Sequence, residues 1–213
     1  VQKLLAGTNI ALITDAGTPG ISDPGEELVK MAYEAGIEVT SLPGACACVT
    51  ALTLSGLSTR RFVFEAFLPP DKKEHKLALE RLKNETRTMI VYEAPHHLLK
   101  TLRELLETLG NRRLTLCREL TKKHETAWQT TLEDAITRYE QEDPKGECVL
   151  VIEGRSQKEI EDEAKAAFEE ISIEEHMKRY EDQGIARKEA MKLVAKDRGV
   201  TKRDIYQYLL GKE

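Results

Sequence analysis

The sequence predicts an α/β fold followed by a helical extension, and three observations support this. Up to residue 154, short apolar runs typical of buried strands alternate with segments whose apolar residues recur at helical spacing. Glycine and proline residues separate these segments. After Gly154 the strand signals stop and a highly charged sequence follows. We therefore expect an α/β part and a separate helical part.

The first elements form two strand–helix units. Residues 9–14 (NIALIT) are an apolar run typical of a buried parallel strand, and residues 26–35 have helical spacing that stops at Gly36. Residues 37–42 predict a second strand, and residues 45–54 predict a helix of small residues.

The next elements continue the alternation. The apolar pattern predicts strands over residues 61–67, 88–92, 113–118 and 147–153, and helices over residues 71–84 and 96–109. The segment 126–131 is a candidate for an additional, antiparallel strand.

The C-terminal part changes the sign of its charge along the chain. Residues 156–182 contain ten acidic and four basic side chains, which is typical of a solvated helix or a linker. Residues 187–213 contain eight basic and four acidic side chains. A helix over 186–198, a turn at Gly199 and a second helix capped by Thr201 predict a helix-turn-helix.

Composition narrows the class of protein. The chain has 213 residues, 40% of them hydrophobic and 32% charged, and a net charge of −5. This favours a soluble, cytoplasmic, globular protein whose contacts with nucleic acid need a local basic patch. No apolar run approaches the roughly 18–20 residues that span a membrane. The four cysteines lack the spacing of zinc sites, so we expect reduced thiols and no metal.

Two glycine-rich bends are the strongest local motifs. Residues 15–25 (DAGTPGISDPG) follow the first predicted strand, and residues 43–48 (PGACAC) follow the second. Bends at strand ends let the main chain approach a ligand closely, although a surface loop or tight packing would give the same pattern. Neither bend matches the dinucleotide or triphosphate motifs. Cys46 and Cys48 have no adjacent basic residue, so we expect buried thiols rather than nucleophiles.

Polar residues follow two further strands. Residues 92–97 (YEAPHH) end one predicted strand and residues 118–125 (RELTKKHE) end another, so both should lie at the sheet edge that carries the glycine-rich bends. The charges there predict a polar cleft, or equally a structural ion-pair network. Adjacent histidines point in different directions, which argues against a metal pair at His96 and His97.

Taken together and in this order, DAGTPGISDPG, SLPGACACVTALTLSGL, FEAFLP, YEAPHHL, CRELTKKHE and KGECVLVIEG resemble the ribosomal RNA small subunit methyltransferase I family. That family lies within the tetrapyrrole (corrin/porphyrin) methylase superfamily. The resemblance covers residues 2–154, and the tail is similar to the family's helix-turn-helix-like extension. It implies two α/β lobes, with 1–42 a remnant of the first lobe, 43–154 the second lobe, and 155–213 the helical linker and tail.

The resemblance also implies an activity, 2′-O-methylation of a cytidine ribose in 16S rRNA of the small ribosomal subunit by a homodimer. S-adenosylmethionine would be the cofactor, held by the two glycine-rich loops and closed in by later strand ends. Cys46 stands where the family usually has serine, and His97 where arginine usually follows Pro-His. The implied cofactor-binding residues are Asp15, Ala16, Gly17, Thr18, Pro19, Gly20, Ile21, Ser22, Pro43, Gly44, Ala45, Cys46, Ala47, Tyr92, Arg118, Leu120 and Gly146.

The family begins with a glycine-rich strand and an acidic Glu-Asp-Thr-Arg segment that do not precede Val1 here. We therefore expect the 213-residue chain to bind the cofactor weakly or not at all. Micromolar binding by calorimetry would contradict this expectation.

Ribose methylation needs alignment of the 2′-oxygen, exclusion of water, and a base or cation that lowers the hydroxyl pKa. The candidates near the cleft are Glu93, Glu119, Lys122 and Glu147, without a choice among them. Phosphate contacts are expected from Lys188, Lys192, Lys202 and Arg203, with Arg60 and Arg61 secondary.

Two alternatives remain open at this point. A tetrapyrrole methylase would share the lobe motifs but leave the basic tail without a purpose. A DNA-binding regulator would use the C-terminal helix pair but leave residues 1–154 unexplained.

Overall fold

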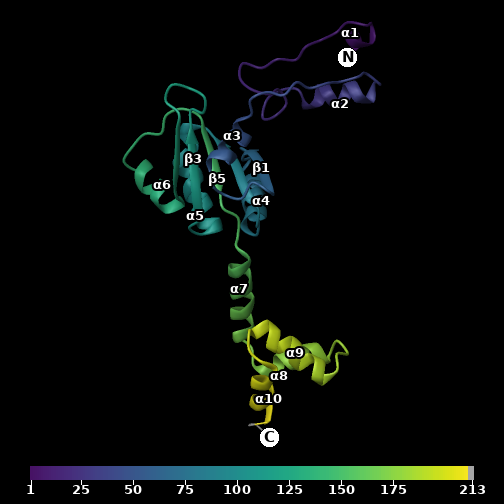
Figure 1. Ribbon diagram of the computed structural model, residues 1–213, viewed down its shortest axis with the longest axis vertical. Coiled ribbons are helices and arrows are strands. Elements are labelled where there is room, and N and C mark those ends of the chain that lie inside the picture. Colours follow the sequence, from purple (N-terminus) through teal and green to yellow (C-terminus); the bar gives the residue numbers. More distant parts are fainter. Residues whose placement is uncertain (211–213) are drawn as a thin grey trace. The chain divides into compact units, whose positions relative to one another are not determined.

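The computed structural model describes residues 1–210, with the side chains of residues 164, 167 and 169 left out. It divides into two compact units, Val1–Gly154 and Arg155–Glu213 (Figure 1). None of the helices within the described range is both long and apolar enough to span a membrane.

The N-terminal region of the first unit contains three short helices, α1 (Gln2–Leu5), α2 (Glu26–Glu34) and α3 (Ala47–Leu54). The strands predicted over residues 9–14 and 37–42 are wrong, because both segments lack regular structure. Apolar side chains there stay open to solvent, with Ile13 and Leu42 each 83% exposed. A strand needs hydrogen-bonded neighbours, and the described part of the chain supplies none for these two segments.

The five later strands form one sheet. They are β1 (Phe62–Phe67), β2 (Thr88–Glu93), β3 (Arg113–Arg118), β4 (Thr126–Thr131) and β5 (Cys148–Ile152), in the order β1-β2-β5-β3-β4. All five were predicted from the sequence. The pair β1–β2 is parallel and the other pairs are antiparallel. The carboxyl ends of β1, β2 and β3 therefore share one sheet edge with the start of β5.

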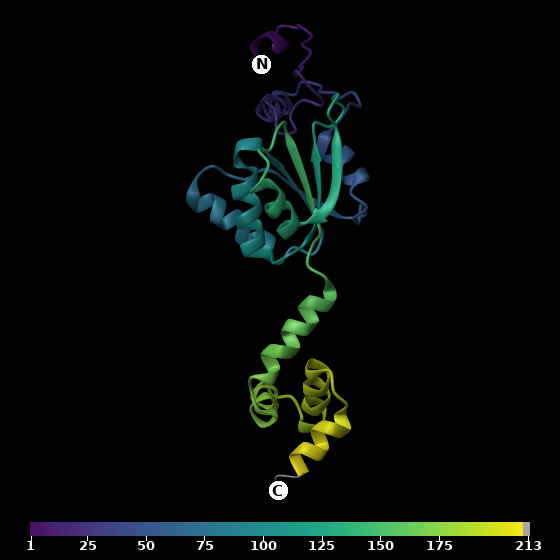
Figure 2. The same ribbon diagram turned by 90° about the vertical axis from the view of Figure 1, so that its left-hand side faces the viewer.

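Helices cover both faces of this sheet (Figure 2). On one face lie α4 (Lys72–Lys83), α5 (Pro95–Leu109) and α6 (Leu132–Tyr139), whose leucines form the larger core with β2, β3 and β5. On the other face, α3 packs Ala51 and Leu52 against Ile90 and Val151. The sequence missed α6, although Thr131 caps its first turn by accepting the Asp134 N–H.

The second unit is a helical cluster of α7 (Gln157–Glu169), α8 (Ile173–Glu181), α9 (Arg187–Arg198) and α10 (Lys202–Leu210). Its core contains Met177, Val194 and Ile205. Gly199 ends α9 at φ +65°, in the left-handed region that favours glycine. α9 and α10 lie where the sequence predicts two helices joined by a turn at Gly199. The segment expected to be solvated, in contrast, buries His176 and Met177 on α8.

Candidate active site

The two glycine-rich loops contact each other directly. The Thr18 hydroxyl donates a hydrogen bond of 3.0 Å to the carbonyl oxygen of Ala45. A Cβ atom at Gly17 would lie 3.0 Å from that same oxygen, and one at Gly44 would lie 3.1 Å from Thr18 Oγ1. Gly17 also has a φ of +77°. Gly17 therefore combines a backbone conformation that favours glycine with a close main-chain contact, whereas a side chain at Gly44 would only displace Thr18 Oγ1 by a few tenths of an ångström.

The second loop is tied to the sheet through α3. The Cys48 N–H, in the first turn of α3, donates a 2.8 Å hydrogen bond to the hydroxyl of Tyr92 on β2. The Tyr92 ring packs edge-on against Phe64 and Phe67, with centroids 4.9 and 5.7 Å away. Burial raises the pKa of Tyr92 above its ordinary value, so the hydroxyl stays neutral.

Cys48, which ends this loop, is not an activated thiol. Cys46 Sγ and Cys48 Sγ lie 3.3 Å apart, and Cys48 is buried. Burial raises the pKa of the Cys48 thiol to about 11, with Cys46 adding to the shift. A thiol with this pKa is protonated at neutral pH and is a poor nucleophile.

The strand ends meet as the sequence led us to expect. In the sheet register Glu93 lies opposite Cys148, and Cys148 lies opposite Arg118. Arg118 Nε donates to Thr126 Oγ1 at 3.3 Å, and Leu120 packs against the core under α3. The ends of β2 and β3 and the start of β5 thus lie side by side.

Three of the candidate catalytic residues form one ionic cluster at this edge. Lys122 Nζ lies 2.8 Å from Glu147 Oε2 and 3.1 Å from Glu119 Oε1. The Glu147 N–H also donates to Glu119 Oε1 at 3.1 Å. The hydrogen bond to Glu147 and then that to Glu119 raise the pKa of Lys122, and Lys122 lowers the pKa of Glu119. The cluster therefore carries a fixed ammonium between two carboxylates.

The loop that holds this cluster has a strained backbone. Glu119 and Thr121 have φ values of +49° and +65°, a region that residues other than glycine rarely occupy. Gly146, with φ +77°, faces the Glu119 side chain so closely that a Cβ atom would collide with it. Such strain is typical of functional sites, where surrounding contacts maintain it.

Glu93, the fourth candidate, is set apart from the cluster by its burial. Its side chain accepts the Ala94 N–H at 2.8 Å and the Thr101 hydroxyl at 2.5 Å, and the residue is 8% exposed. The sequence analysis missed Thr101, which is buried on α5. A threonine among the leucines of an apolar helix face was the available signal, because a buried hydroxyl needs a partner.

The basic residues proposed for RNA lie on the second unit. Lys188 and Arg203 are exposed on α9 and α10, Lys202 begins α10 and is half-buried, and Lys192 pairs with Glu189 at 2.8 Å. Arg60 and Arg61 are exposed just before β1. A search of the described residues for clusters of His, Cys, Asp and Glu able to hold a metal ion finds none.

Comparison with known proteins now defines the class. Residues 1–136 match the family model of Tetrapyrrole (Corrin/Porphyrin) Methylases. The fold is similar to the crystal structure of the methyltransferase CobJ, with a TM-score of 0.54 and 20% identity over 71% of this chain and 67% of that one. The chain is thus a methyltransferase with the fold of the tetrapyrrole methylases.

Curated relatives define the family within that class. The ribosomal RNA small subunit methyltransferase I of Synechocystis is 45% identical over 100% of this chain and 75% of its own length. Proteins of the same name from Halalkalibacterium halodurans and Escherichia coli are 48% and 39% identical, over 97% and 100% of this chain and 71% and 73% of their own lengths. The chain belongs to the ribosomal RNA small subunit methyltransferase I family.

Proposed function

We propose that this protein transfers a methyl group from S-adenosylmethionine to the ribose 2′-oxygen of a cytidine in 16S rRNA. The observation that carries the proposal is the contact between Thr18 and Ala45, which joins the two glycine-rich loops next to the polar sheet edge. The names of the curated relatives favour ribosomal RNA over a tetrapyrrole or duplex DNA as substrate. We further propose a cytoplasmic homodimer as the working form.

The two glycine-rich loops offer hydrogen-bonding groups that suit the cofactor. Main-chain N–H and C=O groups flanked by small side chains are available over residues 15–22 and 43–47, and most of these residues are exposed. Such groups suit the polar methionine and adenosine parts, with Tyr92, Arg118, Leu120 and Gly146 closing the adenosine side. When bound, S-adenosylmethionine supplies a methyl carbon whose bond to a positively charged sulfur breaks as the ribose oxygen attacks in line.

The residues at the polar sheet edge are assigned the remaining catalytic and positioning roles. We assign Lys122 as the cation that stabilises negative charge developing on the ribose oxygen, because its two carboxylate partners keep it protonated and in place. Glu147, whose side chain is 83% exposed, is the carboxylate most open to substrate and would accept the hydroxyl proton. Glu93 would be a positioning residue that orders the Ala94–Pro95 turn through its contacts with Ala94 and Thr101.

The test is methyl transfer from labelled cofactor by the protein's complete natural chain. The acceptors are 30S particles, naked 16S rRNA, uroporphyrinogen and duplex DNA, and label should enter the ribosomal RNA alone. Lys122→Met should lower turnover at least about tenfold. Glu147→Gln should lower it by about 10²–10⁴-fold, the range typical of general acid–base catalysis. The matched neighbours Lys123→Met and Glu142→Gln should not.

Two results would contradict the proposal. Label in uroporphyrinogen but not in RNA would reassign the substrate. Full activity in both cluster variants would remove Lys122 and Glu147 from the chemistry.

A further inference from the structure

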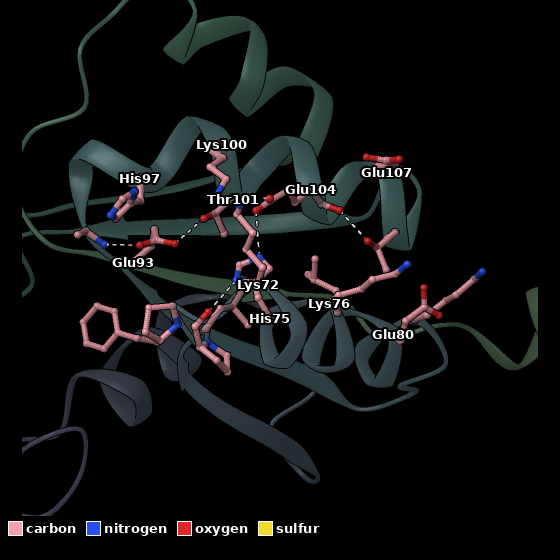
Figure 3. Close-up of a pocket in the computed structure, with 18 residues that line it drawn as sticks. Lys72, His75, Lys76, Glu80, Glu93, His97, Lys100, Thr101, Glu104 and Glu107 are labelled. Carbon is pink, nitrogen blue, oxygen red and sulfur yellow. Dashed lines mark hydrogen bonds and ion pairs between the residues drawn. The ribbon is translucent and has the colours of Figure 1, made fainter.

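A groove that the sequence analysis did not anticipate runs between α4 and α5, on the sheet face opposite α3 (Figure 3). Its volume is about 970 Å³, at the upper end of the range for ligand pockets. Phe67 at the end of β1 and Glu93 and Ala94 at the end of β2 line it. The groove therefore reaches the same sheet edge as the candidate active site.

The α4 wall of the groove is basic. Lys72, Lys76 and Lys83 lie four and seven residues apart, so they share one face of the helix, and all three line the groove. Their side chains are exposed, and none has an ion-pair partner among the residues that the structure describes. Unpaired ammonium groups on one helix face are suited to a row of phosphates.

The acidic side chains of the groove are mostly engaged or remote. Glu104 lies 3.1 Å from His75 Nε2 and 3.7 Å from Lys100 Nζ, while Glu93 accepts hydrogen bonds from Ala94 and Thr101. Figure 3 shows Glu80, on α4, and Glu107, on α5, on opposite sides of the groove at the end away from Glu93. The end next to the sheet edge is thus the one that favours an anion.

Phe67 gives this end an exposed aromatic surface. The residue is 52% exposed, which is high for phenylalanine. A bulge in the β1–β2 register falls between Phe64 and Ala66, and Ala66 has a φ of +55°. A bulge re-aims the side chains that follow it, and bulges with strained backbones are over-represented beside active sites. The chain therefore maintains local strain next to a phenylalanine that packs against the Tyr92 ring and leaves about half of its surface exposed.

We propose that the end of the α4–α5 groove at Phe67 binds single-stranded RNA next to the nucleotide to be methylated. A base stacks on the Phe67 ring, and Lys72 and Lys76 contact the adjoining phosphates. Aromatic side chains beside a basic track are the general way in which proteins hold single strands, because every base offers a face for stacking. The inference rests on the proposed function and adds a second substrate contact to it.

The experiment measures the affinity of the full chain for a fluorescent 12-nucleotide single-stranded RNA, without cofactor, across a salt series. Phe67→Ala should weaken binding roughly 5- to 150-fold, as expected for one lost base stack, and Phe67→Trp should restore it. Phe62→Ala is the matched control, because Phe62 is also exposed but lies at the other end of β1. For an oligonucleotide of the same length with abasic positions, Phe67→Ala and the wild type should have the same affinity.

The charge contacts are tested with paired double variants on one helix. Lys72→Glu with Lys76→Glu should reduce the slope of log K against log salt by about 1.4, the value for two lost phosphates of a single strand. Lys73→Glu with Arg81→Glu makes the same charge change on α4, outside the groove lining, and should leave the slope unchanged. Circular dichroism of each variant checks that α4 remains folded.

The outcomes separate this inference from the proposed function. If Phe67→Ala and the Lys72/Lys76 variant bind RNA as their controls do, while the protein still methylates ribosomal RNA, the groove assignment is wrong and the proposed function stands. If the protein binds the oligonucleotide through the groove but transfers no methyl group to RNA, the proposed function fails and the groove site stands. If the protein does not bind the oligonucleotide at all, the groove assignment is wrong, and the methyl-transfer assay decides the proposed function by itself.

Discussion

Removing one hydroxyl tests the link between the second glycine-rich loop and the sheet. Tyr92→Phe deletes the acceptor of the 2.8 Å hydrogen bond from the Cys48 N–H and leaves the ring contacts with Phe64 and Phe67 in place. A neutral hydrogen bond of this kind contributes about 0.5–1.5 kcal/mol to the free energy of unfolding. With a urea m value of about 2 kcal/mol per molar, the unfolding midpoint should fall by about 0.25–0.75 M.

The chain offers both a reporter and a control for this measurement. Its single tryptophan, Trp128, lies on β4, so tryptophan fluorescence follows unfolding of the sheet unit. Tyr33→Phe removes a hydroxyl from an α2 side chain that is 64% exposed, and its midpoint should not move. The m value should stay the same in both variants, because the surface exposed on unfolding is unchanged.

A Tyr92→Phe midpoint equal to that of Tyr33→Phe would refute this reasoning. It would mean that the Cys48 N–H finds water or another acceptor at no cost, and that α3 keeps its place on the sheet by apolar packing alone.

Two further predictions concern the second unit. Burial, and then the charge of Arg198, lower the pKa of His176, which lies 3.3 Å from Asp197. The unfolded chain protonates His176 at its ordinary pKa near 6.5, whereas the folded unit protonates it only at a lower pH. The contribution of neutral His176 to the free energy of unfolding is therefore fully present above pH 6.5 and is lost as the pH drops below it. Hydrogen exchange of α8–α10 amides should report this loss relative to the β-sheet amides, and His176→Gln should abolish it. Neutralising Lys188 and Arg203 together should reduce the slope of log K against log salt for RNA binding by the amount expected for one or two lost phosphate contacts. The slope is measured by titrating the RNA affinity over a salt series. An unchanged slope would place the phosphate contacts elsewhere.

Local sequence patterns were sufficient to predict most of the helices and strands. The strand 113–118 was predicted with its observed bounds, and α5 begins one residue before its predicted start, at a proline favoured in the first turn. The strand predictions for residues 9–14 and 37–42 were wrong for a reason that local sequence patterns cannot show. Their apolar character favours strands, but a strand also needs a partner strand, and pairing is a property of the tertiary fold.

The candidate site likewise combines features that the sequence predicts with features that only the structure shows. Motif order was enough to place the strand ends at Tyr92 and Arg118 at one sheet edge, because strand ends share an edge whenever the strands share a sheet. The contact between the loops around Thr18 and Ala45 has another origin, since the segments that precede these loops are not strands. Motif order could not choose among the catalytic candidates. Only the structure groups Lys122 with Glu119 and Glu147 and buries Glu93 against Thr101, since these contacts join residues up to 28 positions apart.

The sequence by itself therefore determined the type of most helices and strands, the family to which the chain belongs, and the bends that could approach a cofactor. These follow from side-chain periodicity and from glycine and proline, which act within a few residues. The tertiary structure decided which strands pair, which charges meet, and that Phe67 is among the residues lining a groove between α4 and α5. Those outcomes depend on long-range packing, in which the energy of each contact is set by neighbours that are distant along the chain.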